Sequence, residues 1–144
     1  MWKETTHHER NLTIWKKELE DFVPQRVLDF HVHVWPRGVL PSGETFSCGG
    51  YPIEHYEIEE LREDLLAVYP GRRAGAVCFG LPFPQYDQAE NDRYLARACD
   101  QESFFPLRLL DPAEDPDKVR RDVIEGRFAG VKPYPDYVRK ADVS

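Results

Sequence analysis

Residues 27–34 read Val27-Leu28-Asp29-Phe30-His31-Val32-His33-Val34, and apolar and polar side chains alternate along them. This period of two predicts a β-strand, because residues two apart share a face of a strand but not of a helix. The expected apolar face consists of Leu28, Phe30, Val32 and Val34. Asp29, His31 and His33 are expected on the other face, so both imidazoles would lie on one side of a sheet.

Two imidazoles at this spacing, roughly 6.6 Å apart along a strand, can lean toward one point and share a metal ion. We therefore predict that His31 and His33 bind a divalent metal, with zinc as the first choice. Asp29 lies two residues deeper, where a carboxylate can orient a ligand histidine. The alternative is a polar stripe on a half-exposed sheet. The long loop that begins at Trp35 favours the metal, because α/β barrels place their chemistry in such loops.

Composition argues against several classes of function. The chain has 144 residues, of which 41% are hydrophobic, and this is ordinary for one domain with a core. An excess of 26 acidic over 19 basic residues gives a net charge of −7, which argues against nucleic-acid and anionic-membrane partners. No apolar run is long enough to span a bilayer, and no signal peptide is expected. The widely spaced Cys48, Cys78 and Cys99 indicate free thiols and a cytoplasmic protein.

The rest of the chain alternates between predicted helices and strands. An amphipathic helix is expected within residues 1–25, and its inner face would consist of Leu12, Trp15, Leu19 and Phe22. Three further strands are predicted at residues 74–81, 104–110 and 128–132. Helices are expected to begin near residue 58 and directly after Asp87 and Asp115, which are candidate N-caps. Regular alternation of this kind predicts an α/β fold with a parallel sheet covered by helices.

Residues 35–52 form a connection that is rich in glycine and proline and longer than most loops in α/β units. Its aromatic residues Trp35, Phe46 and Tyr51 favour a lid that packs over a pocket, and we expect the lid to be mobile when the site is empty. His55 follows this loop and is a candidate third metal ligand, the alternative being a loop residue without that role. The terminal pair His7 and His8 is expected to be solvated.

Two segments of the chain resemble a known family. Residues 28–33 (Leu-Asp-Phe-His-Val-His) resemble the first-strand signature of the amidohydrolase superfamily. Residues 130–135 (Gly-Val-Lys-Pro-Tyr-Pro) resemble the fourth-strand signature of its branch of metal-dependent decarboxylases related to aminocarboxymuconate semialdehyde decarboxylase, and Leu110-Asp111-Pro112 fits the end of the third strand there. The chain departs from that branch at Tyr134, where the branch commonly has histidine, and at Pro133, where it has an aliphatic residue.

The resemblance implies the N-terminal half of a TIM (β/α)8 barrel within a single domain of residues 1–144. An N-terminal helix in residues 1–25 would precede strands 1–4 in residues 27–137, whereas a whole barrel needs eight strands and about 250 residues. The implied activity is that of a metal-dependent hydrolase or non-oxidative decarboxylase of small molecules. Further metal ligands and the catalytic aspartate of the family come from later strands.

Two basic residues near the expected strand ends have open interpretations. Lys132 is a candidate catalytic residue, because binuclear members of the superfamily carboxylate the corresponding lysine to bridge two metals. Its alternative is a side chain that only extends along the apolar strand to the rim. Arg108 is a candidate substrate-binding residue that would hold a carboxylate in bidentate fashion, or else an ion-pair residue at the barrel rim.

Two functions therefore stand open for the chain. In the first, His31 and His33 hold a divalent metal, most simply zinc, in a hydrolase or decarboxylase that is completed by later strands. In the second, the chain is a catalytically incomplete half-barrel or a non-enzymatic association module. It would be inactive alone and would pair with another chain, including a second copy of itself, through its open sheet edge.

Overall fold

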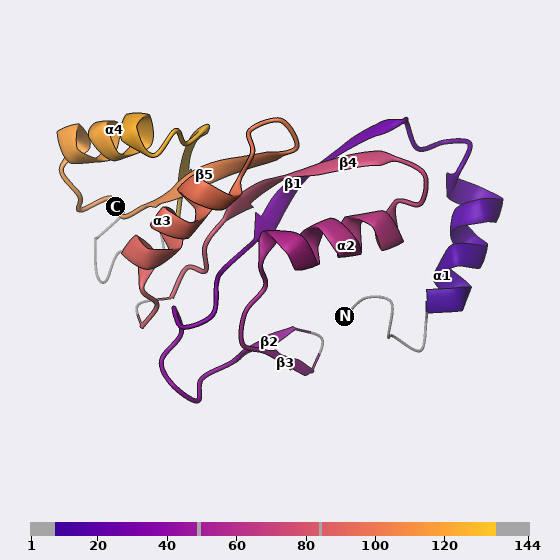
Figure 1. Cartoon of the computed structure of the whole chain (residues 1–144), viewed down its shortest axis with the longest axis horizontal. Coiled ribbons are helices and arrows are strands. Elements are labelled where there is room, and N and C mark those ends of the chain that lie inside the picture. The colour runs from indigo at the N-terminus through magenta and orange to yellow at the C-terminus, as the bar shows by residue number, and fades with distance from the viewer. Residues whose placement is uncertain (1–7, 49, 84, 135–144) are drawn as a thin grey trace, which may run out of the picture.

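The computed structural model describes residues 8–48, 50–83 and 85–134. Its centre is a curled, fully parallel sheet of four strands in the order β1-β4-β5-β6. These strands are β1 (Arg26–His33), β4 (Arg73–Phe79), β5 (Phe104–Leu110) and β6 (Gly130–Pro133). Spatial order follows chain order, and Figure 1 shows the sheet running from α1 at one end of the molecule to α4 at the other. The α/β class and the parallel sheet predicted from the sequence are confirmed.

One helix follows each of the first three sheet strands: α2 (Ile58–Val68), α3 (Gln88–Ala98) and α4 (Pro116–Glu125). The N-caps of α3 and α4 are the predicted ones. Asp87 accepts a hydrogen bond from the Glu90 N–H, and Asp115 accepts one from the Asp117 N–H. The longest helices within residues 8–134, α2 and α3, have 11 residues each. In the part of the chain that the structure describes, no helix has the length and apolar character needed to cross a membrane.

The main core lies between the sheet and the helices. Its buried members include Ala76 and Cys78 of β4, Phe104 of β5, and Leu61 and Leu65 of α2.

 

Leu95 of α3 belongs to the same core and is fully buried. Cys78 and Cys99 are both buried there as free thiols, which confirms the sequence prediction for these two cysteines. This apolar layer packs the sheet against α2 and α3.

The N-terminal helix is only partly as predicted. It consists of α1 (His8–Ile14) and the π-helical turn η2 (Trp15–Leu19), and Trp15 is its buried residue. Leu19 and Phe22 were expected on the inner face, but both are exposed, Phe22 to 83%. The π-helical turn shifts the residues that follow it around the helix axis, so a regular spacing of three and four does not carry through. His8 begins α1, and His7 lies outside the described residues.

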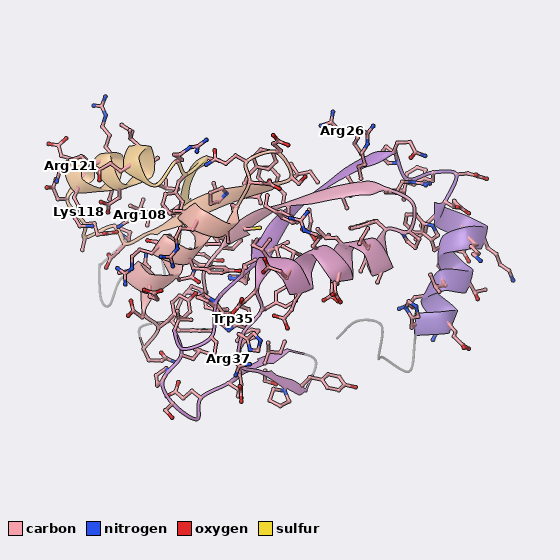
Figure 2. The ribbon with its side chains drawn as sticks, in the orientation of Figure 1. Arg26, Trp35, Arg37, Arg108, Lys118 and Arg121 are labelled. Atoms are coloured by element: carbon pink, nitrogen blue, oxygen red, sulfur yellow. The ribbon has the colours of Figure 1, made fainter. Side chains whose placement is uncertain are left out.

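The connection between β1 and α2 contains a short antiparallel hairpin, β2 (Phe46–Cys48) and β3 (Tyr51–Ile53). Trp35 and Tyr56 exchange two backbone hydrogen bonds, of 2.8 and 2.9 Å, which tie the start of the loop to its end. Trp35 packs in a second core cluster with Val39, and Figure 2 shows Trp35 and Arg37 beside the hairpin. The loop thus has a core of its own, and its mobility in the empty protein stays a prediction.

Candidate metal centre

His31 and His33 lie together at the carboxyl end of β1. Their ring centroids are 5.4 Å apart, with an angle of 58° between the ring planes. Both rings meet Phe79 edge-on, with centroid distances of 5.0 Å for His31 and 4.7 Å for His33. Phe79 ends β4 and is fully buried, so it forms a rigid floor beneath the two imidazoles.

Strand β1 does not keep the strict alternation that the sequence predicts. Asp29 is in register with Ala76 and Val32 with Cys78, so three steps along β1 match two steps along β4. This bulge places Asp29 and Val32 on the helix side of the sheet, whereas His33 is in register with Phe79. The expectation that Asp29 shares the face of His33 is therefore wrong.

The same bulge changes the apolar face of β1. Leu28 is 47% exposed and Phe30 is 72% exposed, although both were expected to pack with Val32 and Val34. Val34 is fully buried, and Val32 packs against the main core. The strand therefore has apolar side chains on both sides, and Leu28 and Phe30 remain exposed.

The carboxylate of Asp29 has a local partner. It accepts a hydrogen bond of 3.0 Å from the backbone N–H of His31. Within the described residues, no hydrogen bond joins Asp29 to either imidazole ring. Asp29 therefore fixes the backbone of a candidate ligand, and its predicted role in orienting a ligand ring stays a prediction.

His33 has a defined ring orientation. Its Nδ1 lies 2.7 Å from the carbonyl oxygen of Gly80, and a carbonyl can only accept, so Nδ1 carries the hydrogen. The lone pair of neutral His33 is then on Nε2. Burial lowers the pKa of His33, and the nearby His31 and Lys132 lower it further, against the opposing effect of the bond to Gly80. The lowered pKa favours the neutral imidazole, which is the form that binds a metal.

Two residues at the end of β6 complete the group around Phe79. The Lys132 ammonium lies 5.0 Å from the Phe79 ring centroid and 5.5 Å from that of Tyr134. The Tyr134 hydroxyl lies 3.5 Å from Nε2 of His33, and burial raises the pKa of this hydroxyl. The sequence singled out Lys132, but it gave Tyr134 no role beyond its departure from the family pattern.

The histidine pair fits a metal ion in its spacing and in its hydrogen bonding. Two rings bound to one tetrahedral zinc through nitrogen, at about 2.0–2.1 Å each, would have centroids roughly 5 Å apart. A ligand histidine usually donates its other ring N–H to a carbonyl or carboxylate, as His33 does to Gly80. However, the described residues contain no group of three or more His, Cys, Asp or Glu side chains arranged to hold a metal. This part of the chain thus provides two candidate ligands, fewer than the three protein ligands that a catalytic zinc usually has.

His55, the candidate third ligand, has other contacts. Its Nε2 lies 3.3 Å from an Arg37 guanidinium nitrogen and 3.8 Å from a Glu60 carboxylate oxygen. Arg37 also pairs with Glu54 at 2.9 Å. His55 thus lies with Arg37 and Glu60 near the N-terminus of α2. Among the described residues it forms no metal-binding group with His31 and His33.

A cavity of about 550 Å³ lies beside the histidine pair, along the open edge of β1. It is mainly apolar, and its lining includes both histidines and Leu61 and Leu65 of α2. The β1–α2 connection contributes Trp35, Phe46, Tyr51, Ile53 and Tyr56. The loop expected to cover a pocket therefore forms one wall of this cavity. Among the described residues, the carboxylates that line it are those of Asp29 and Asp64. Asp64 accepts a hydrogen bond of 2.9 Å from the Tyr56 hydroxyl.

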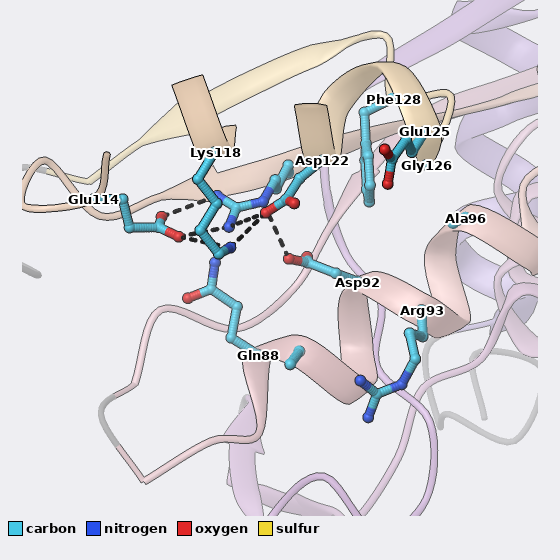
Figure 3. Close-up of a pocket in the computed structure, with 12 residues that line it drawn as sticks. Gln88, Asp92, Arg93, Ala96, Glu114, Lys118, Asp122, Glu125, Gly126 and Phe128 are labelled. Atoms are coloured by element: carbon cyan, nitrogen blue, oxygen red, sulfur yellow. Dashed lines mark hydrogen bonds and ion pairs between the residues drawn. The ribbon is translucent and has the colours of Figure 1, made fainter. Parts of the chain in front are cut away.

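Arg108 lies in a separate cluster. It is in register with Val131 on β6 and only 5% exposed, and it pairs with Glu114 through two bonds of 2.9 and 2.6 Å. It also lies 3.0 Å from Asp122 of α4 and 3.6 Å from Asp92 of α3. Figure 3 shows Glu114, Asp122 and Asp92 converging beside Lys118. The guanidinium is thus occupied by carboxylates of its own chain, as the ion-pair interpretation predicts.

Replacing Asp92 by asparagine is expected to alter how stability depends on pH. Burial raises the pKa of Asp92 from 3.8 to about 7, despite the nearby Arg108. Because the folded pKa lies above the unfolded one, the contribution of Asp92 to stability is present below pH 4 and is lost as the pH rises through 7. From pH 5 to pH 8 the parent chain should therefore lose roughly 2–3 kcal/mol of unfolding free energy that Asp92→Asn does not lose, since one pKa unit is about 1.4 kcal/mol.

Urea unfolding of both proteins at the two pH values measures this difference and cancels the titrations that they share. A difference between parent and variant that stays constant from pH 5 to pH 8 would contradict the raised pKa of Asp92.

Comparison with known proteins identifies no relative. No family model, no curated protein and no solved structure matches this chain.

Proposed function

We propose that the chain forms half of a metal-dependent hydrolase or non-oxidative decarboxylase of the amidohydrolase type. The observation that carries the proposal is the pair of imidazoles, 5.4 Å apart, at the carboxyl end of β1. In α/β barrels, ligands and catalytic groups gather at the carboxyl ends of the strands. The orientation of the His33 ring by Gly80 adds to this argument, because it leaves Nε2 to bind the ion.

The half-barrel part of the proposal rests on the sheet. It is curled and parallel, its strands follow chain order, and a helix follows each of the first three. A closed barrel of this kind has eight strands, so four strands correspond to half of one. A complementary half would pair with the open edges of β1 and β6 and would supply the ligands that the described residues lack.

A divalent ion bound here would supply Lewis-acid polarisation of a carbonyl or carboxylate oxygen and activation of water. His31 and His33 would hold the ion, and Phe79 would keep the two rings in place. Lys132, whose ammonium lies over Phe79, would attract a substrate carboxylate, and its use as a carboxylated metal bridge remains the alternative. The Tyr134 hydroxyl, close to His33, would donate a hydrogen bond to a substrate oxygen.

The second candidate function is a catalytically incomplete association module. It is favoured by the open edges of the sheet and by exposed apolar residues near them, namely Leu28, Phe30 and Val131. Unpaired edges beside apolar surface invite pairing with another chain. Light scattering after size-exclusion chromatography shows whether the chain associates with itself, and the zinc experiment below shows whether it also holds metal.

Zinc binding to the chain is expected to depend on both histidines. Two ligands form a partial site, so the parent chain should bind Zn²⁺ more weakly than structural zinc sites, whose binding free energies are about 10–16 kcal/mol. His31→Ala or His33→Ala should each weaken binding by roughly tenfold or more, because each removes a large share of the ligand set. Equilibrium dialysis against Zn²⁺ measures this.

His55→Ala is the matched control, because it removes a histidine that contacts Arg37 and Glu60 instead. It should bind zinc as the parent chain does. Equal zinc binding by the parent chain and by both site variants would refute the proposed metal site. So would a loss of binding in His55→Ala of the same size.

A further inference from the structure

Asn91 of α3 is buried without hydrogen bonds for its side chain. It is 1% exposed, and neither its amide nitrogen nor its amide oxygen has a partner in the described part of the chain. An unsatisfied buried polar group costs about 1–3 kcal/mol, so its presence in a core calls for a physical reason. In the structure, the Asn91 amide packs against Gly80.

Gly80 directly follows β4. A Cβ atom placed on Gly80 would fall inside van der Waals contact with Nδ2 of Asn91 and 3.0 Å from the Tyr86 hydroxyl. Gly80 is not among the residues with positive φ, so its backbone conformation is open to any residue. Position 80 therefore requires glycine because a Cβ atom would overlap with Asn91. Without a side chain, the backbone of Gly80 can lie closer to α3 than that of any other residue could.

The same residue holds the candidate ligand on its other side. The carbonyl oxygen of Gly80 accepts the hydrogen bond from Nδ1 of His33 at 2.7 Å. The Gly80 backbone is thus confined between the Asn91 amide and the His33 ring. Asn91 is fully enclosed and cannot retreat, so any group added to Gly80 must displace the backbone that carries this carbonyl.

We infer that Gly80 and Asn91 are positioning residues that together hold His33 in the tautomer with hydrogen on Nδ1, which directs the Nε2 lone pair into the site. The use of that lone pair for a metal rests on the function proposed above. The tautomer itself is a property of the metal-free chain. The two claims can therefore be tested separately.

The test is imidazole ¹⁵N NMR of the metal-free full chain at a pH where His33 is neutral. The parent chain should show His33 mainly as the Nδ1–H tautomer. Gly80→Ala should give a mixture of tautomers, because its methyl group displaces the carbonyl. Asn91→Ala should also give a mixture, because the Gly80 backbone loses the wall that confines it. This second variant removes an unsatisfied amide, so it remains informative where Gly80→Ala fails to fold.

The double variant Gly80→Ala/Asn91→Ala should return His33 toward the Nδ1–H tautomer, because the new methyl group occupies the space that the amide leaves. Gly130→Ala in β6 is the matched control: its nearest contact would be an ordinary 3.5 Å to Leu107, and the His33 tautomer should not change. Zinc affinity should fall by roughly 10–100-fold in the single variants, as it does when an orienting partner of a ligand histidine is lost.

The inference is overturned if Asn91→Ala keeps the parent tautomer, or if the double variant is no closer to the parent than the two single variants are. It is supported by the reciprocal rescue, whether or not zinc binds. If the tautomers respond as expected while zinc affinity does not depend on His33, the positioning role stands and the proposed metal site fails.

Discussion

Replacing Phe79 by alanine is expected to destabilise the protein by about 3–5 kcal/mol, the usual cost of removing a large aromatic side chain from a core. Phe79 is fully buried at the end of β4. Its ring also contacts both imidazoles and the Lys132 ammonium, so one substitution removes the floor of the candidate site. Urea unfolding followed by circular dichroism measures the loss of stability.

Phe30→Ala is the matched control for this prediction, since it deletes the same ring from the neighbouring strand at a position that is 72% exposed. Its effect should stay within about 0.5 kcal/mol, as for most surface substitutions. Comparable losses in the two variants would mean that the ring of Phe79 is not packed as described.

Replacing Arg108 by methionine is also expected to lower the free energy of unfolding, by about 3–5 kcal/mol. The change keeps a long side chain but leaves Glu114, Asp122 and Asp92 without the cation that they share. Arg108→Met/Glu114→Gln should recover part of this loss, because Glu114 makes two bonds to Arg108 and the second substitution removes its unpaired charge. Chemical unfolding of the two variants measures both effects.

Arg37→Met provides the comparison, because Arg37 pairs with Glu54 at the surface, where ion pairs contribute about 0–1 kcal/mol. If Arg108→Met is no more destabilising than Arg37→Met, the buried cluster does not contribute to the fold as the structure implies.

Local patterns predicted the fold class and the histidine pair. The positions of the sheet strands follow from short apolar runs, and the starts of α3 and α4 follow from Asp87 and Asp115. The two imidazoles share a site because they are two residues apart at the end of a strand. These features depend only on neighbours in the chain, which is why the sequence was sufficient.

The bulge in β1 could not be predicted, because it arises from the pairing of β1 with β4. It moves Asp29 to the helix side and leaves Leu28 and Phe30 unburied, although the sequence alternates without interruption. Similarly, the partners of Arg108 come from α3 and α4, and only the packing of these helices on β5 decides between an ion pair and a substrate-binding residue.

Gly80 and Tyr134 were missed for the same reason. Gly80 is 47 residues from His33 along the chain, and Tyr134 is 101 residues from it. Neither residue belongs to a sequence pattern that includes His33. For Gly80 the signal was a glycine near the end of the apolar run at residues 74–81. For Tyr134 the signal was its position two residues after the predicted fourth strand.

The central claim is that His31 and His33 share one metal ion, and zinc titration followed by imidazole ¹⁵N NMR tests it most directly. We predict that resonances of both rings shift together with one stoichiometric zinc, that Nε2 is the responding nitrogen of His33, and that His55 does not respond. Separate shifts of the two rings at different zinc concentrations, or a response at His55 with none at His33, would contradict the claim.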